Sequence, residues 1–404
     1  MKVRVNVENK DSNKPGGSIK FQYGLLIIES KRAAKIIRRL SKNRSTKFLG
    51  YLGVPVFVAL LLFAFYLLLS TLAANLFSQA VRQAEGSLPI QSYLLIPGVN
   101  PFVPLVYGLI GLVVAVSVHE VSHGIMAWRE NISVEGAGMI LFLFIPLGAF
   151  VRPSESEIAA SGFSQKMEVF TAGVSSNVIL AVITLALLVL VIMPTVHTTQ
   201  LATSGVAVFS VEANSPAQHA GIRPGDVIRE IQGYLTPNTT VLSKLEATVL
   251  RPGENVSVVL ADGRTVYAVL AANPINTSIA LLGFIPFQPQ TTLNEWRHPS
   301  NPLVYFVPAT IEPTPLNPST QTLYTSSIPG WVGLSNTLFW LWWININLAV
   351  FNALPATPLD GGQVIREVFL KIYKSKQKAE SATQLLSAIV FGLIIVLIIL
   401  PRAL

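Results

Sequence analysis

The sequence predicts an α-helical polytopic membrane protein with about five or six transmembrane helices, a membrane-embedded β-hairpin and an inserted mixed α/β domain. Composition is the first observation: 51% of the 404 residues are apolar and 12% are charged, whereas globular domains carry about 25% charged residues. The second is a series of long apolar runs, and the third is the return of charge and strand-like alternation in residues 201–272. The chain has no cysteine, which excludes disulfides, thiolate nucleophiles and cysteine-bound metals.

Five apolar runs are long enough to cross a bilayer as helices. They lie at about 49–77, 103–128, 169–193, 331–351 and 383–400. A further apolar stretch, residues 134–152, is interrupted by glycines and by Pro146, which argues against a spanning helix. Non-helical backbone survives at membrane depth only where protein covers it. This stretch therefore predicts a hairpin or re-entrant strand packed against protein.

Basic residues are concentrated at the amino-terminal end. Residues 1–47 hold 13 Lys and Arg against three acids, and within them residues 30–40 predict an amphipathic helix on the membrane surface. Basic residues also follow the second and fourth runs, so the positive-inside rule places these segments and the N-terminus in the cytoplasm of a cell-membrane protein. Aromatic and basic residues are not interleaved, so we expect a lipid bilayer as the partner and no nucleic acid.

These features divide the chain into five regions. Residues 1–47 form a basic cytoplasmic tail with its interfacial helix, and residues 48–194 form a membrane core with the first three spans. Residues 201–272 form a folded extracytoplasmic domain, followed by an extracytoplasmic loop region at 273–330 that is rich in Pro, Thr, Ser and Asn. Residues 331–404 complete the membrane core with the last two spans.

A His-Glu-x-x-His motif lies inside the second apolar run. On a helix His119 and His123 share one face, so both imidazoles can bind one metal ion while Glu120 accepts a proton from water. No charged residue occurs between Glu85 and the motif, and ionisable groups at membrane depth indicate function. The alternative, a pair of histidines satisfied by nearby carbonyls, is weaker in lipid.

A tetrahedral site needs a third protein ligand. Asp360 ends a charge-free stretch that begins after Glu312, so it can approach the two histidines from another segment. Gly361 and Gly362 would allow a tight backbone turn behind it. An ordinary Asp-Gly turn before a helix starting near Gln363 explains the same residues, and the local sequence leaves both interpretations open.

The two motifs together resemble the site-2 protease family of intramembrane metalloproteases. The second motif is Asn352-x-x-Pro355-x-x-x-Leu359-Asp360-Gly361-Gly362. The resemblance implies one Zn²⁺ per chain bound by His119, His123 and Asp360, with Glu120 as general base. It also implies hydrolysis of a peptide bond within a transmembrane segment, with single-span membrane proteins as substrates.

Two asparagines belong to the same resemblance. Ala172-Gly173-Val174-Ser175-Ser176-Asn177 is similar to the family's Ala-Gly-Pro-x-x-Asn motif, with Val174 in place of proline. The family implies that Asn177 and Asn352 contact the substrate backbone or the developing oxyanion, for which a positioned donor is worth several kcal/mol. The alternative is that these buried amides only tie helices together.

The inserted domain has a signature of its own. Ser215-Pro216-Ala217-x-x-Ala220-Gly221-Ile222-x-Pro224-Gly225-Asp226 resembles a PDZ domain of the protease-associated type. PDZ folds bind an extended peptide along a sheet edge, so the resemblance implies a peptide ligand or a steric filter for substrates.

Two rival functions come from other classes. A catalytically silent membrane scaffold would use the PDZ-like domain to bind partners, but all the proposed catalytic residues are present. A metal transporter usually shows internal repeats, and the sequence shows none.

Overall fold

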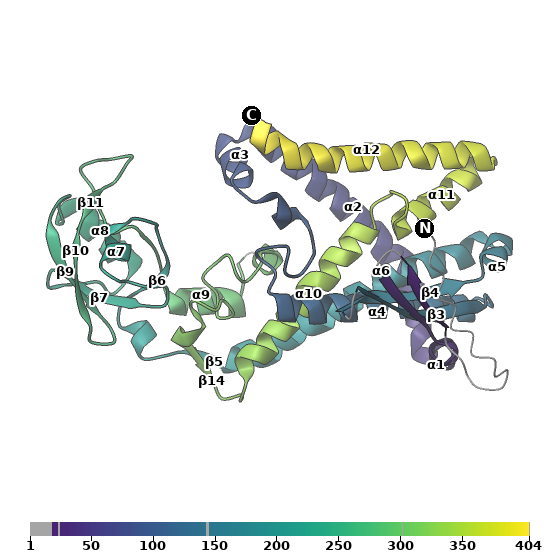
Figure 1. Ribbon diagram of the computed structural model, residues 1–404, viewed down its shortest axis with the longest axis horizontal. Coiled ribbons are helices and arrows are strands. Elements are labelled where there is room, and N and C mark those ends of the chain that lie inside the picture. Colours follow the sequence, from purple (N-terminus) through teal and green to yellow (C-terminus); the bar gives the residue numbers. More distant parts are fainter. Residues whose placement is uncertain (1–17, 23–24, 143–144, 301, 404) are drawn as a thin grey trace. The chain divides into compact units, whose positions relative to one another are not determined.

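The computed structural model describes residues 18–22, 25–142, 145–300 and 302–403. The chain forms two compact units, one made of the residues up to Thr184 together with Trp340 onward, and the other of Leu185–Phe339. Each unit is described by itself below (Figure 1). The expectations for residues 1–17 lie outside the described residues.

Long helices dominate the first unit. Four helical segments are long and apolar enough to cross a membrane: Arg44–Phe77, Leu105–Arg129, Phe163–Thr195 and Lys376–Ala403. They contain the helices α2 (Lys47–Phe77), α4 (Leu105–Arg129), α6 (Phe163–Leu187) and α12 (Lys376–Ala403). Four of the five predicted spans are therefore present as suitable helices. Shorter helices are α1 (Lys31–Ser41), α3 (Gln79–Gly86), α5 (Glu155–Ala160) and α11 (Asp360–Tyr373).

The remaining predicted span is the helix α10 (Trp331–Asn352), which is not among the four segments that qualify by length and composition in the described chain. The polar side chains of α10 make its composition less apolar than that of the other four segments. One of them, Asn345, is fully buried and donates from Nδ2 to the carbonyl of Leu341 at 2.7 Å. Trp340 and Ala349 are also fully buried. A helix enclosed by protein can carry amides that a lipid-facing helix would exclude, so the number of crossings stays a prediction.

The predicted hairpin is part of a larger sheet. Strands β3 (Val134–Phe142) and β4 (Ile145–Pro153) pair antiparallel as expected. The sheet order is β1-β2-β3-β4, because β1 (Ser18–Gln22) and β2 (Leu25–Glu29) from the amino-terminal tail add a second hairpin to β3. The prediction of a basic tail with an interfacial helix did not include these two strands. The first four residues of β2 are all apolar and pair with apolar residues of β3, for example Ile27 with Ile140.

Helix α1 forms where the sequence predicts it. The Ser30 hydroxyl caps its first turn by accepting from the amide of Ala33 at 3.4 Å. Its apolar face packs on α4 and β3, with Ile37 buried. A Cβ at Gly124 of α4 would lie 2.9 Å from both Ile37 and Val151, so glycine allows α1 and β4 to pack closely against α4.

The second unit contains an antiparallel sheet of order β10-β9-β7-β6-β13, with β8 paired to β7. Its elements are β6 (Val206–Val211), α7 (Pro216–His219), β7 (Val227–Ile231), β8 (Tyr234–Leu235), α8 (Thr239–Thr248), β9 (Asn255–Leu260), β10 (Thr265–Val269) and β13 (Phe284–Phe287). Val208, Ile228, Leu242 and Val258 belong to its buried core.

The region expected to be loop, residues 273–330, with a possible strand at 280–284, contains two strands there and further elements that were not predicted. It contributes β13 to the edge of the sheet and forms the helix α9 (Pro289–Arg297). Short pairs join β11 (Ala271–Ala272) to β12 (Ala280–Leu281) and β14 (Tyr324–Ser326) to β5 (Val196–Thr198). Trp296 of α9 is 2% exposed and packs edge-on against Tyr305. The high proline and threonine content of this region favours a loop prediction, and the contacts that order it join residues distant in the sequence.

Candidate metal centre

Two helices of the first unit bring three metal-binding side chains together. His119 and His123 lie one turn apart on α4, and Asp360 is the first residue of α11. The Oδ2 atom of Asp360 lies 3.0 Å from His119 Nε2 and 3.2 Å from His123 Nε2, and the two Nε2 atoms are 3.1 Å apart. Residues more than two hundred positions apart thus present their ligand atoms to one point.

This donor set fits a zinc ion. The Nδ1 atom of His123 donates to the carbonyl of Val169 at 2.7 Å, so in the neutral ring Nε2 keeps its lone pair and faces the Asp360 carboxylate. Ligand atoms on a tetrahedral zinc with bonds of about 2.0–2.1 Å lie about 3.3 Å apart, close to the observed separations. Two imidazole nitrogens and a carboxylate oxygen gathered at a buried point can hold a cation, and this donor set suits zinc.

Glycines allow Asp360 to reach this position, but not through a tight turn. Helix α11 starts at Asp360 itself, and neither Gly361 nor Gly362 has a positive φ angle. A Cβ at Gly361 would collide with the carbonyl of Leu354, and one at Gly362 would lie 2.6 Å from the backbone of Ala356. Glycine is needed because the start of α11 lies directly against the preceding chain, which corrects the turn proposed from sequence.

Glu120 lines the same cavity as the three ligand residues. The cavity has a volume of about 360 Å³, and Val116, Val151, Asn352 and Gln363 also contribute to it. The Oε2 atom of Glu120 accepts a hydrogen bond of 3.0 Å from the backbone amide of Val151 in β4. This contact holds the carboxylate beside the ligand set. No sequence pattern indicates this hydrogen bond, because it joins a helix side chain to a strand backbone.

Gly173 of α6 packs directly on the two imidazoles. A Cβ at this position would lie 2.5 Å from Nε2 of His123 and 2.6 Å from Cε1 and Nε2 of His119. The Ala-Gly pair of the motif around Asn177 therefore has a steric function that sequence reasoning did not assign.

We expect Gly173→Ala to weaken zinc binding about 10- to 100-fold, the effect typical of disturbing the shell around metal ligands. The added methyl group must push at least one ring away from the common point. Zinc affinity measured by competition with a chromogenic chelator checks this result. Gly392→Ala in α12 is the matched control, since nothing lies within 4 Å of its Cβ; equal zinc affinity in the two variants would contradict the steric role.

The two asparagines differ in their surroundings. Asn177 is fully buried on α6, one turn beyond Gly173, and neither its Oδ1 nor its Nδ2 has a hydrogen-bond partner among the described residues. Leaving a buried amide unpaired costs about 1–3 kcal/mol, so a ligand group is a reasonable partner. Asn352 lines the cavity, but its Nδ2 donates to the carbonyl of Leu348 in its own helix at 3.1 Å.

An ion pair that the sequence did not reveal connects the two helices behind the site. Lys166 Nζ of α6 lies 3.0 Å from Glu367 Oε2 of α11, and both side chains are about nine-tenths buried. Helix α11 begins with Asp360 and α6 carries Gly173, so this pair fixes the helix that supplies the carboxylate relative to the helix that supports the imidazoles.

A membrane core of apolar helices with this donor set places the chain in the class of membrane metalloproteases. The particular family follows from comparison: the family model described as Peptidase family M50 matches residues 107–397, a span that includes both motifs. The chain belongs to this family, the site-2 protease family.

Two curated proteins are similar to this chain over most of its length. The chain is 26% identical over 343 residues to "Uncharacterized protein MJ0971" of Methanocaldococcus jannaschii, covering 84% of this chain and 76% of the relative. It is 25% identical over 317 residues to "Putative zinc metalloprotease CPE1693" of Clostridium perfringens, covering 68% of this chain and 90% of that protein.

Proposed function

We propose that this protein is an intramembrane zinc endopeptidase that hydrolyses a peptide bond within a transmembrane segment of a single-span membrane protein. The observation that carries the proposal is the convergence of His119, His123 and Asp360 on one point beside Glu120, in a cavity lined by residues of the membrane core. Membership of peptidase family M50 supports a protease.

The side chains around the cavity have distinct tasks in this proposal. His119, His123 and Asp360 would hold a zinc ion, which would supply Lewis acidity to the scissile carbonyl and to water. Glu120 takes the proton from the attacking water and passes it to the leaving amine. Asn352 lines the cavity and offers an amide donor to the developing oxyanion, and losing one such donor typically costs 10²–10³ in rate. The family resemblance gives Asn177 the same role, although its amide is fully buried outside the cavity lining.

The substrate must unwind before its carbonyl can react, and β4 offers an edge for the unwound strand. Among the described residues β4 pairs only with β3, and its Val151 amide points away from β3 toward Glu120. Backbone groups alternate along a strand, so the amide of Ala149 faces the same open side. A substrate strand added there would run past the ligand set along α4, against which β4 packs.

The decisive experiment compares wild type and Glu120→Gln on a single-span substrate in detergent or liposomes. We expect cleavage to fall about 10²- to 10⁴-fold, the range typical of losing a general base, while zinc content stays at one ion per chain. Glutamine retains an oxygen that can accept from the Val151 amide, so the cavity is preserved. A chelator should stop the wild-type reaction and added zinc restore it. Wild-type turnover in the zinc-loaded variant would support the scaffold alternative instead.

The open edge of β4 is tested by placing proline at Ala149. Ala149→Pro removes an amide that faces away from β3, so we expect cleavage to fall at least 10-fold while the sheet and the zinc content persist. Ala149→Val keeps the amide and serves as the matched control. Gel-based cleavage assays and metal analysis measure both effects; full activity of the proline variant would refute strand addition at β4.

The distribution of basic residues supports a cytoplasmic N-terminus and an extracytoplasmic second unit in a cell-membrane protein. We attribute a PDZ-like role to that unit, which recruits or filters substrates. Its signature residues shape turns: Ser215 caps α7 by accepting from the Gln218 amide at 3.2 Å, and Gly225 has a φ of 88°. The edge strand β10 exposes Tyr267 and Val269, an apolar surface suited to an extended peptide.

A further inference from the structure

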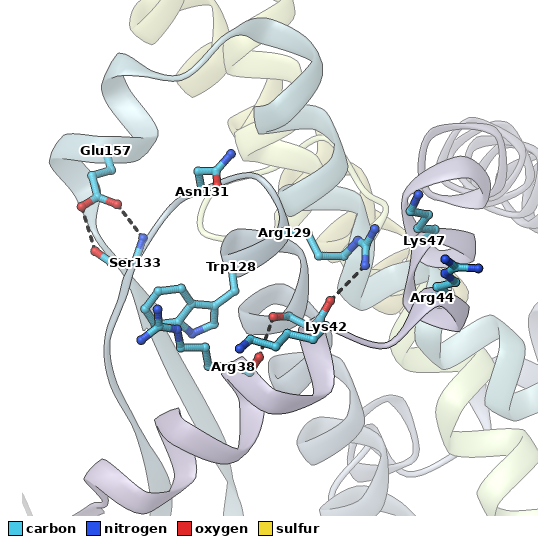
Figure 2. Close-up of a pocket in the computed structure, with 10 residues that line it drawn as sticks. Arg38, Lys42, Arg44, Lys47, Trp128, Arg129, Asn131, Ser133 and Glu157 are labelled. Atoms are coloured by element: carbon cyan, nitrogen blue, oxygen red, sulfur yellow. Dashed lines mark hydrogen bonds between the residues drawn. The ribbon is translucent and has the colours of Figure 1, made fainter.

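A pocket of about 600 Å³ lies in the first unit, away from the metal centre, where the last turn of α4 meets the end of α1 and the start of α2 (Figure 2). Five of its lining side chains are cationic, and one is acidic, Glu157. The cations are Arg38, Lys42, Arg44, Lys47 and Arg129. The pocket therefore carries a net charge of four positive units, counted as five cations minus one carboxylate.

No acid pairs directly with these cations, although the charge of Glu168 acts on Arg129. Within the part of the chain that the structure describes, none of the five forms an ion pair within 4.0 Å. Glu157 is occupied elsewhere, because it accepts hydrogen bonds from the backbone amide and the hydroxyl of Ser133 at 2.5 and 2.8 Å. These two hydrogen bonds lower the pKa of Glu157. A cluster of like charges is unfavourable by itself and favours an anionic ligand.

Two of the guanidinium groups are already held in place. Arg129 Nη1 donates to the carbonyl of Ser41 at 2.9 Å and to the hydroxyl of Thr46 at 3.1 Å. Arg38 stacks over the ring of Trp128, 4.8 Å from its centroid. Figure 2 shows Arg38 and Trp128 on one side of the pocket and Arg44 and Lys47 on the other, with Arg129 between them. Such preorganised donors reduce the ordering cost of binding.

Trp128 supplies a second indication of a ligand. Its indole Nε1 is buried and has no hydrogen-bond partner among the described residues, although the ring lines the pocket. A buried donor without an acceptor is unfavourable. Tryptophan at the end of a membrane helix also typically lies at the level of lipid headgroups.

The surface next to the pocket is apolar. The pocket lies at the common end of two segments suited to cross a membrane, the start of α2 and the end of α4. Directly after Lys47, α2 presents Phe48 and Tyr51 with 59% and 76% of their surfaces exposed. A charged pocket bordered by exposed apolar side chains matches a molecule with an anionic head and a hydrocarbon tail.

We propose that this pocket binds the phosphate headgroup of an anionic phospholipid, whose acyl chains lie along the exposed face of α2. The guanidinium groups of Arg38 and Arg129 contact the phosphate, and Lys42, Arg44 and Lys47 add charge around it. A soluble phosphate compound shares the headgroup chemistry, but it would leave the adjoining apolar surface unused. The site tethers α1 to the membrane surface at a defined point, beyond the general attraction of a basic tail.

Native mass spectrometry of the full-length protein in neutral detergent tests the proposal, with phosphatidylglycerol and phosphatidylcholine as probes. We expect wild type to retain one phosphatidylglycerol in a saturable manner and to bind phosphatidylcholine far more weakly. The triple variant Lys42→Gln, Arg44→Gln, Lys47→Gln should bind phosphatidylglycerol on the order of 100-fold more weakly, since each surface cation contributes severalfold to anionic lipid binding.

The matched control replaces three exposed lysines outside the pocket, Lys374, Lys376 and Lys378, with glutamine and should leave binding unchanged. Unchanged zinc content and unfolding temperature show that each variant is folded; if the triple variant fails this check, the single variants Arg44→Gln and Lys47→Gln should each give a partial loss. Equal binding by folded triple and wild-type proteins, or equal losses in variant and control, would overturn the proposal. Graded uptake without saturation would also overturn it. Full displacement of the lipid by millimolar inorganic phosphate would identify a soluble phosphate as the ligand instead.

Discussion

Asp360→Ala is expected to abolish stoichiometric zinc binding, because it removes the third protein ligand and leaves only the two imidazoles of α4. Disturbing even a residue behind a metal ligand costs 10- to 100-fold in affinity, so loss of the ligand itself should lower affinity more than about 100-fold. Peptide-bond cleavage should fall with the metal content. Metal analysis after dialysis against a weak chelator provides the measurement.

Gln363→Ala is the matched control for this prediction. Gln363 lines the same cavity, one turn further along α11, but contributes no ligand to the three-residue cluster. Zinc should remain at one ion per chain in this variant. If Asp360→Ala also retained one tightly bound zinc, the ligand assignment would be wrong and the proposed chemistry would lose its basis.

Lys166→Met should destabilise the protein by about 3–5 kcal/mol, since it leaves the buried carboxylate of Glu367 without its partner. Replacing both residues removes the charge and the need to compensate it. The double variant Lys166→Met, Glu367→Met should therefore lie within about 1 kcal/mol of wild type or exceed it in stability. Denaturant unfolding in detergent, monitored by tryptophan fluorescence, measures the free energy of unfolding of wild type, the two single variants and the double variant, which together form a double-mutant cycle.

The single variant should also bind zinc more weakly than the double variant, because the pair holds α11 against α6. Additive losses in the two single variants, with no recovery in the double variant, would show that Lys166 and Glu367 act independently. That outcome would separate the ion pair from the placement of Asp360.

The helical spans and the histidine pair could be predicted from sequence because their signals are local. Hydrophobic run length predicts a spanning helix, and the four-residue spacing of His119 and His123 predicts a shared helix face. The role of Asp360 was harder to predict, because its local sequence also fits a helix-capping turn. Its proximity to the histidines depends on packing between α4 and α11. The resemblance to site-2 proteases, and not the spacing, favoured the alternative in which Asp360 lies beside the two histidines.

The features that were missed depend on pairing between distant segments. Strand β2 joins β3 although more than a hundred residues separate them, and Lys166 pairs with Glu367 across 201 positions. In both cases the local sequence of one partner does not predict which distant segment it will contact. The hydrogen bond from the Val151 amide to Glu120 also has no local signal, because almost any residue at that position would supply the amide. The small size of Gly173 matters only because two imidazoles lie against it.

The addition of β1 and β2 to the β3-β4 hairpin has a consequence for biosynthesis. During translation the tail strand leaves the ribosome before its partner, and two long apolar helices must enter the bilayer in between. Sheet closure is therefore a late, non-local step that carries a large loop-closure entropy. A nascent chain stalled before β3 would hold the β1-β2 hairpin with one edge of the apolar strand β2 unpaired, which makes this interval the point at which a folding chaperone would have most to protect.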